Sequence, residues 1–236
     1  MSLICISDLH LDVTVPTRLD ALRNLLVCES KNIDAIYILG DLVEAWVGDD
    51  DDSEFANTIR KILSNCAKQS ALYLMHGNRD FLIGEKFASD TGACLIDDPT
   101  TIEVAGVRFL LSHGDAFCTK DEAYQQMRTL VRSPDWQSNI LNRSLQERIN
   151  LASEMRQQSR QSNANKSQNI MDVTGEVVLS VMEENECDVL IHGHTHRPAI
   201  HRMDDSKTRY VLGDWNHCGW LTRIEDGHVS LECFPI

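Results

Sequence analysis

The sequence predicts an α/β protein in which buried strands alternate with helices and carry polar side chains at their ends. Each of five apolar runs is followed directly by a short polar motif, and the C-terminal stretch alternates between apolar and polar positions. Continuous apolar runs are typical of parallel strands covered on both faces, whereas alternation is typical of half-buried antiparallel strands. The apolar runs lie at residues 3–6, 35–39, 71–75, 107–111 and 189–191.

The spacing of the polar motifs predicts one strand and one helix per interval, followed by an insertion. Motif positions 8, 41, 78 and 113 are separated by 33, 37 and 35 residues, which fits one such unit each. The next motif, at 194, follows after 81 residues, 46 more than the interval before it (81 − 35). We therefore expect one domain over residues 1–236, with a helical insertion, or lid, over residues 117–171.

Helical periodicity predicts the crossovers and the content of the insertion. In the insertion, one helix ends before Pro134, and another begins at the capping-box pattern of Ser144 and Glu147. The expected helices span residues 17–29, 53–66, 81–89, 120–132, 144–160 and 172–185. The alternating C-terminal positions predict strands at 200–203, 209–212, 220–224 and 229–234.

The charge and the cysteines exclude several classes of protein. The net charge of −14 argues against nonspecific nucleic-acid binding, although residues 117–171 carry eight basic and five acidic side chains and form a locally basic segment. This segment suggests a docking surface for an anionic ligand. The eight cysteines show no Cys-x-x-Cys spacing, so we expect reduced, mostly buried thiols in a cytosolic protein. We expect neither a signal peptide nor a membrane-spanning helix.

The polar motifs hold seven candidate metal ligands and no cysteine. Oxygen and imidazole donors are harder than the cysteine thiolates of a structural zinc site, so this set suits Mn, Fe or Mg-like ions better than such zinc. Asp41 is the best bridge between two ions, because a carboxylate is readily shared. One ion would take Asp8, His10 and His196, and the other Asn78, His113 and His194. The alternative is that these are turn-forming Asp and Asn residues and scattered polar histidines.

The order Asp-x-His, Gly-Asp, Gly-Asn-x-Asp, His-Gly and Gly-His-x-His resembles the calcineurin-like metallophosphoesterase superfamily. The resemblance implies an α/β (α+β) fold of two packed mixed β-sheets flanked by helices, here with a helical insertion cap. It also implies a dinuclear centre at the strand ends, with the ligands paired as above and a hydroxide between the ions as nucleophile.

Arg79 departs from the usual pattern of that superfamily, in which a His follows the motif Asn. Arginine stays protonated and cannot act as a general acid, but it can clamp a phosphate and neutralise developing charge. A phosphate that leaves from a phosphoanhydride needs no proton, so Arg79 favours a pyrophosphate substrate. We expect Asp80 to orient Arg79, and a surface role for Arg79 is the alternative.

The motifs around Arg79 and in residues 40–50, 112–115, 165–173, 193–198 and 212–215 resemble a branch of the superfamily that acts in lipid A biosynthesis. This resemblance implies Mn-dependent hydrolysis of UDP-2,3-diacylglucosamine to UMP and 2,3-diacylglucosamine 1-phosphate, with two Mn²⁺ ions and attack at the α-phosphorus. It implies catalytic roles for Arg79, Asp80 and His194. It implies substrate contacts from Asn78, Arg79, Asp121, Ser159, Asn163, Lys166 and His194, to which we add Trp46, Tyr124 and Arg156.

A lipid substrate implies a peripheral protein on the cytoplasmic face of the inner membrane, with the basic insertion turned towards the bilayer. Two other functions stay open. One is a dinuclear hydrolase of another nucleotide pyrophosphate, which would share the metal site. The other is a noncatalytic scaffold of the same fold, which the filled ligand positions disfavour.

Overall fold

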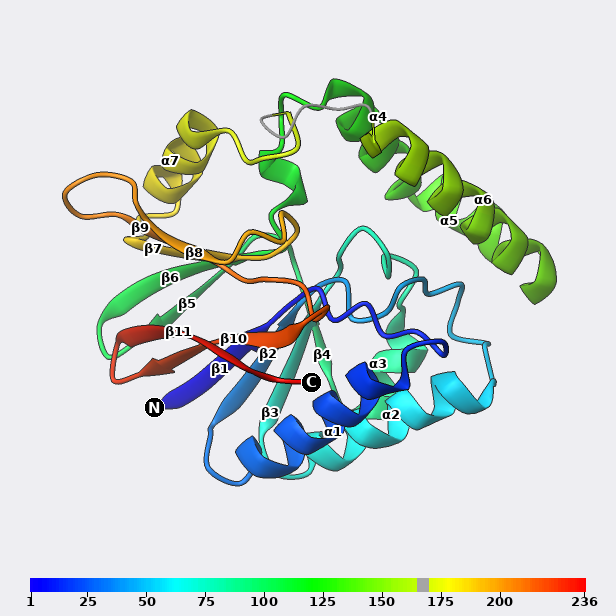
Figure 1. The fold of residues 1–236 in the computed structure, drawn as a ribbon, viewed down its shortest axis with the longest axis horizontal. Helices are drawn as coiled ribbons and strands as arrows, with labels where there is room; N and C mark the ends of the chain where they lie inside the picture. The colour runs from blue at the N-terminus through cyan, green and yellow to red at the C-terminus, as the bar shows by residue number, and fades with distance from the viewer. Residues whose placement is uncertain (165–169) are drawn as a thin grey trace.

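Two β-sheets pack face to face in the computed structural model, which describes residues 1–164 and 170–236 apart from the side chains of 163 and 164. Helices cover the outer face of each sheet (Figure 1). The first sheet runs β11 (His228–Pro235), β10 (Cys218–Glu225), β1 (Ser2–Ile6), β2 (Ala35–Leu39), β3 (Ala71–Met75), β4 (Cys94–Ile96). The second runs β5 (Thr100–Val104), β6 (Val107–Ser112), β7 (Val189–His192), β9 (Thr208–Val211), β8 (Ala199–Arg202).

The strand directions follow the sequence pattern. Strands β1 to β4 are parallel, as are β6, β7 and β9, whereas β8, β10 and β11 pair antiparallel with their neighbours. The predicted fold class, two mixed sheets flanked by helices, is therefore confirmed. The five motif-bearing strands are divided between the sheets: β1, β2 and β3 belong to the first, and β6 and β7 to the second.

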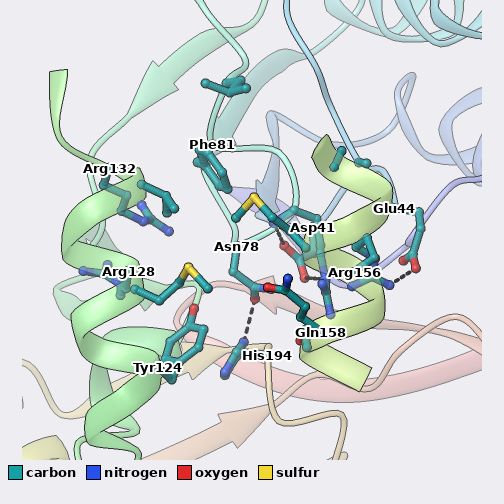
Figure 2. Close-up of a pocket in the computed structure, with 18 of the residues that line it drawn as sticks. Asp41, Glu44, Asn78, Phe81, Tyr124, Arg128, Arg132, Arg156, Gln158 and His194 are labelled. Carbon is teal, nitrogen blue, oxygen red and sulfur yellow. Dashed lines mark hydrogen bonds and ion pairs between the residues drawn. The ribbon is translucent and has the colours of Figure 1, made fainter. Parts of the chain in front are cut away.

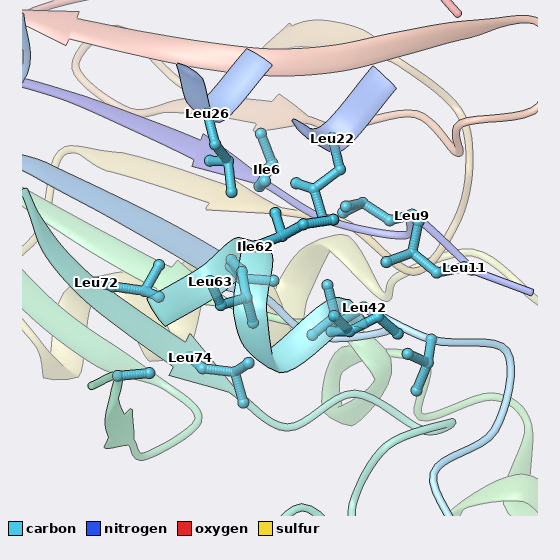
Figure 3. Packing of buried hydrophobic residues seen from close by; sticks show 14 of the residues in the cluster. Ile6, Leu9, Leu11, Leu22, Leu26, Leu42, Ile62, Leu63, Leu72 and Leu74 are labelled. Carbon is cyan, nitrogen blue, oxygen red and sulfur yellow. The ribbon is translucent and has the colours of Figure 1, made fainter. Parts of the chain in front are cut away.

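Helices α1 (Pro16–Glu29), α2 (Glu54–Ala67) and α3 (Glu85–Thr91) cover the first sheet, and α7 (Gly175–Glu184) covers the second. Strand β1 reads as a continuous apolar run because both of its faces are buried. Ile4 and Ile6 pack against the helices, where Figure 3 shows Ile6 beside Leu22, and Leu3 and Cys5 pack between the sheets. On the opposite side, Val178 and Met182 of α7 pack on Leu110 and Leu190.

Several elements differ from the sequence prediction. Strands β4 and β5 are additional: β4 has only three residues, and β5, which does alternate, pairs antiparallel with β6 just ahead of the predicted strand. Helix α3 begins at Glu85 rather than at residue 81, because Asp49 accepts hydrogen bonds from the backbone N–H groups of Gly84 (3.1 Å) and Phe87 (2.9 Å). This carboxylate thus caps a helix far along the chain. All eight cysteines are free, and four of them, rather than most, are buried.

Helices α4 (Glu122–Val131), α5 (Pro134–Leu141) and α6 (Leu145–Ala164) project over the strand ends and, with the flanking residues of 117–171, are called the cap below (Figure 1). Helix α5 is additional: Pro134 begins it, as proline can at a first helical position. The capping box before α6 is present, with the Glu147 carboxylate accepting from Ser144 N–H at 2.9 Å and Ser144 Oγ accepting from Glu147 N–H at 3.4 Å. Among the described residues, none lies in a helix long and apolar enough to cross a membrane.

Candidate metal centre

The seven candidate ligands meet where the carboxyl ends of the two sheets face each other. Asp8 and His10 follow β1, Asp41 follows β2, and Asn78 follows β3, all from the first sheet. From the second sheet, His113 follows β6, and His194 and His196 follow β7. Hydrogen bonds join the two sheets at this point, such as His194 N–H to Asp8 Oδ2 at 2.9 Å. Packing of the two sheets therefore assembles the cluster from both halves of the chain.

Asp8, His10 and His196 form one candidate group. His196 Nε2 lies 3.2 Å from Asp8 Oδ1, and His10 Nε2 lies 3.2 Å from His196 Nε2. Asp8 is fully buried, and its Oδ1 has no hydrogen-bond partner among the described residues. A buried carboxylate oxygen without a donor is costly unless a cation or another ligand satisfies it. These residues therefore fit a bound divalent ion.

Asn78, His113 and His194 form a second group, and Figure 2 shows Asn78 and His194 from the pocket side. Asn78 Oδ1 lies 3.0 Å from His113 Nε2 and 2.9 Å from His194 Nδ1. His113 donates its Nδ1–H to the Leu39 carbonyl at 2.9 Å, which turns Nε2 towards the cluster. A backbone acceptor on one imidazole nitrogen is the usual way in which the other is oriented as a metal ligand.

Asp41 lies between the two groups. Its Oδ2 is 3.8 Å from His10 Nε2, and its Oδ1 is 3.7 Å from His113 Nε2. Each carboxylate oxygen thus faces one group, which is the geometry that a ligand shared by two ions needs. Asp8 also belongs to a second cluster, with Asp41 and His113, so two carboxylates lie close to both positions.

Five of the seven ligands have positive φ angles. They are Asp8 (56°), His10 (45°), Asp41 (51°), His194 (65°) and His196 (55°). The left-handed region is uncommon for residues other than glycine, and such strain gathers at functional sites. The backbone before Asn78 also passes very close to Asp41. A Cβ on Gly77 would lie 2.1 Å from Asp41 Oδ1, so only glycine fits at this position.

Burial and neighbouring charge act in opposite directions on the titratable groups. Burial raises the pKa of Asp8, but the imidazole of His196, whose Nε2 lies 3.2 Å from Asp8 Oδ1, outweighs burial and holds that pKa well below its usual range. For His113, burial lowers the pKa, but Asp41 and Asp115 raise it to about 9. Burial and the charge of His113 lower the pKa of His194 to about 4. The site therefore keeps Asp8 ionised and offers it to cations.

Arg79 and Asp80 have different partners. The Arg79 backbone N–H donates to Asp41 Oδ1 at 2.8 Å, and its guanidinium Nε lies 3.8 Å from Asp41 Oδ2. Asp80 is fully buried and accepts from the backbone N–H groups of Leu42 and Gly77, both at 2.7 Å. Asp80 thus joins the loops after β2 and β3 and orders the backbone from which Arg79 projects.

A pocket of about 470 Å³ lies between the cap and the seven candidate ligands, which are together called the metal cluster below. Figure 2 shows α4 on one side of it, with Tyr124, Arg128 and Arg132, and α6 on the other, with Arg156 and Gln158. The cluster contributes Asp41, Asn78, His194 and His196 to its wall, which Arg79 also lines. The cap contributes apolar side chains, among them Met127, Val131, Trp136, Ile140, Leu151 and Met155.

The structure brings most of the predicted substrate contacts to this pocket. Asp121, Tyr124, Arg156 and Ser159 line it. Asp121 also caps α4 by accepting from Tyr124 N–H at 3.2 Å. Asn163 lies in α6 and its side chain is outside the described residues, as is the whole of Lys166. Trp46 reaches the pocket but is itself buried; its indole N–H donates to Asp49 at 2.9 Å and its ring packs on Phe87.

Sequence reasoning missed the acids that hold the cap. Buried Asp115 accepts from Tyr124 Oη (2.7 Å), Arg128 Nε (2.9 Å) and Arg132 Nη2 (3.4 Å). Its position in the motif His113-Gly114-Asp115, at a strand end, was the one available signal. On the α6 side, Arg148 pairs with Asp50, and Arg156 and Arg160 pair with Glu44. Among the basic side chains of the insertion that the structure describes, five thus pair with acids of the body: Arg128, Arg132, Arg148, Arg156 and Arg160.

Comparison with known proteins gives one consistent result. The family model of calcineurin-like phosphoesterases matches residues 1–198. The chain is 45% identical to the UDP-2,3-diacylglucosamine hydrolase of Cellvibrio japonicus, with all of both chains covered. It is 46% identical to the protein of that name from Chromobacterium violaceum, with 97% of each covered. Among solved structures, an archaeal phosphodiesterase superposes with a TM-score of 0.52 at 13% identity, covering 99% of this chain and 100% of the other, which is a likeness of fold.

Proposed function

Because the chain belongs to the calcineurin-like phosphoesterase family, we propose that it hydrolyses the pyrophosphate of UDP-2,3-diacylglucosamine to UMP and 2,3-diacylglucosamine 1-phosphate. The observation that carries this proposal is the pocket, in which an Asp41-centred metal cluster faces Arg79 on one side and an apolar cap on the other. A diphosphate linked to a lipid needs both surfaces at once. The full-length relatives of this name, at 45% and 46% identity, support the same substrate.

In this proposal, Asp8, His10 and His196 hold one ion, Asn78, His113 and His194 hold the other, and Asp41 is shared. When bound, two divalent ions, which we take to be Mn²⁺, supply a hydroxide nucleophile near neutral pH and charge for the diphosphate oxygens. The mixed oxygen and imidazole donor set suits Mn²⁺. The orphaned Asp8 Oδ1 and the two-sided placement of Asp41 support a pair of ions rather than one.

Arg79 then stabilises the transition state without transferring a proton. Its guanidinium stays charged and presents a rigid fork that matches phosphate oxygens. The departing 2,3-diacylglucosamine 1-phosphate is a phosphate group and needs no general acid. Asp80 acts as a positioning residue, through its hydrogen bonds to Leu42 and Gly77. Asn78 and His194 lie at the boundary between cluster and pocket, where they can contact both metal and phosphate.

The cap, residues 117–171, acts as the lid that selects the acylated sugar. Asp121 and Ser159 line the polar part of the pocket, and Met127, Leu151 and Met155 line the apolar part. Tyr124 and Arg156 are further contacts, and we retain Asn163 and Lys166 on the resemblance alone. Trp46 forms part of the pocket wall but makes no polar contact with the substrate, because its indole N–H donates to Asp49.

The cap also meets the cytoplasmic face of the inner membrane, where the protein binds peripherally. Four large apolar side chains are exposed on its helices: Met127 (41%), Leu130 (54%), Leu141 (44%) and Ile149 (43%). Lys120 and Arg143 are exposed beside them and suit anionic lipid. Leu130→Ser with Ile149→Ser should reduce sedimentation with phosphatidylglycerol vesicles, whereas Val13→Ser with Val27→Ser, on the body, should not. Equal binding of both double variants would refute this orientation.

The activity is tested by UMP release from UDP-2,3-diacylglucosamine, with and without added Mn²⁺, and with UDP-N-acetylglucosamine in parallel. We expect Mn-dependent release from the acylated substrate alone. Equal cleavage of both would keep the dinuclear hydrolase and replace the lipid substrate by another nucleotide pyrophosphate. Failure to cleave either, in a protein shown to bind two ions, would overturn the proposal in favour of a scaffold.

A further inference from the structure

Glu44 touches both the metal cluster and the cap, although it is not one of the candidate ligands. It follows Asp41 by three residues, in the loop after β2. Its Oε2 lies 3.2 Å from His10 Nδ1. Its Oε1 forms an ion pair with Arg156 of α6, drawn in Figure 2, and lies 3.4 Å from Arg160 Nη2. The two carboxylate oxygens thus face opposite sides of the pocket wall.

On the metal side, Glu44 lies next to the imidazole nitrogen of His10 that faces away from the cluster. The Nε2 atom of His10 faces the cluster, near Asp8, Asp41 and His196, so Nε2 is the ligating atom. The Nδ1 atom then faces Glu44 Oε2 at an ion-pair distance of 3.2 Å, and it has no other partner with hydrogen-bond geometry among the described residues. A carboxylate that accepts from the second imidazole nitrogen fixes the tautomer and ring orientation of a metal-ligating histidine and strengthens its basicity.

On the cap side, Glu44 fixes Arg156 while leaving much of its guanidinium group available. Arg156 Nε and Nη1 are buried and have no hydrogen-bond partner among the described residues, and the side chain lines the pocket. Buried donors without acceptors are costly unless a ligand satisfies them. The side chain of Glu44 is 22% exposed and that of Arg156 17%, so this ion pair is shielded compared with the one to Arg160, which is 74% exposed.

We propose that Glu44 is a positioning residue that orients His10 for its metal ion and holds Arg156 of the cap for an anionic group of the substrate. This inference rests on the proposed dinuclear function. Its two halves depend on different properties of Glu44. Orientation of His10 requires a hydrogen-bond acceptor, whereas retention of Arg156 requires the negative charge. Glu44→Gln keeps the acceptor and removes the charge, and Glu44→Ala removes both.

The first measurement is the affinity of the purified full-length protein for Mn²⁺ in the absence of substrate. The titration is monitored through the electron paramagnetic resonance signal of free Mn²⁺. We expect Glu44→Ala to weaken one of two Mn²⁺ sites by about 10- to 100-fold, as loss of such an outer carboxylate does. Glu44→Gln should stay close to the wild type. Asp50→Asn is the matched control, because it breaks another ion pair between α6 and the same loop without approaching a ligand.

The second measurement is KM for the nucleotide substrate at saturating Mn²⁺. Glu44→Gln should raise KM about three- to tenfold with a smaller effect on kcat, and it should add nothing in an Arg156→Ala background, as expected for two coupled residues. Wild-type Mn²⁺ affinity in Glu44→Ala would overturn the metal half. An unchanged KM in Glu44→Gln, or full additivity with Arg156→Ala, would overturn the cap half. A wild-type protein that binds fewer than two ions would instead refute the proposed function.

Discussion

The metal cluster and the cap face each other across one pocket, but they are held in place by different means. The cluster consists of side chains on strand ends with strained backbone, and Asp8, Asp41 and His113 are almost completely buried. The cap is attached by arginines that reach acids of the body, and much of its apolar surface is partly exposed. On the proposed function, we expect a division of labour in which the buried cluster determines the reaction and the more loosely held cap determines the substrate.

The two attachments of the cap differ from each other in the same way. Helix α4 is held through Asp115, whose side chain is fully buried. Helix α6 is held through Asp50 and Glu44, whose side chains are 63% and 22% exposed. An ion pair with an exposed partner contributes little, whereas breaking a buried one leaves an uncompensated charge. Helix α6 is therefore the side of the cap that separates from the body more readily.

The largest effect should come from Asp41, since both candidate ions depend on it. Asp41→Asn keeps an oxygen to accept from Arg79 N–H but removes the shared charge. We expect hydrolysis of every substrate to fall by more than about 10³-fold, because loss of even one electrostatic contact to the transition state costs about 10²–10³. Metal content should fall below two ions per chain, measured by elemental analysis. Two tightly bound ions in the folded variant would show that Asp41 does not bridge them.

The second largest effect should be on stability, when the ion pairs that hold α4 are broken at Asp115. Asp115→Asn should lower the free energy of unfolding by about 3–5 kcal/mol, because it leaves Arg128 and Arg132 beside a neutral group. Asp50→Asn should lower it less, because Asp50 is 63% exposed and Arg148 keeps its hydrogen bond to the Val47 carbonyl. Denaturant unfolding of the two variants measures the contrast. Equal losses would remove the distinction between the two attachments.

The ion pairs of Asp115 with Arg128 and Arg132 also predict a pH dependence of stability. Burial raises the pKa of Asp115, but the charges of His113, Arg132 and Arg128 lower it by more than burial raises it. The folded pKa therefore lies below the unfolded value of about 3.9. A carboxyl with a depressed folded pKa stabilises the protein above its unfolded pKa and loses that contribution as pH falls towards the folded pKa. The stability difference between wild type and Asp115→Asn should therefore be constant above about pH 5 and shrink below about pH 4. A difference that grows on acidification would contradict this assignment.

The sequence was sufficient to predict the cluster and insufficient to predict how the cap is held. Asp8, Asp41 and Asn78 follow strands of strong apolar pattern, so the chain order alone predicts that they converge at one rim. The positive φ angles of these loops and the pairing of Arg156 with Glu44 depend on contacts between distant segments. Helix α5 is not evident from the sequence because a proline can follow the end of one helix or begin another, and Pro134 begins α5. Short β4 had too few residues for a period to show.

The smallest effect should be confined to the lipid part of the substrate. Met155 of α6 lines the pocket, whereas Ile149 of the same helix does not and is 43% exposed. If acyl chains pack against Met155, then Met155→Ala should raise KM for UDP-2,3-diacylglucosamine about tenfold, which corresponds to about two buried methylene groups. The kcat and the Mn²⁺ affinity should stay unchanged, because the cluster is untouched, and Ile149→Ala should have no effect in a detergent assay. A fall in kcat with KM unchanged would mean that the cap takes part in the chemical step, and the division between the two regions would fail.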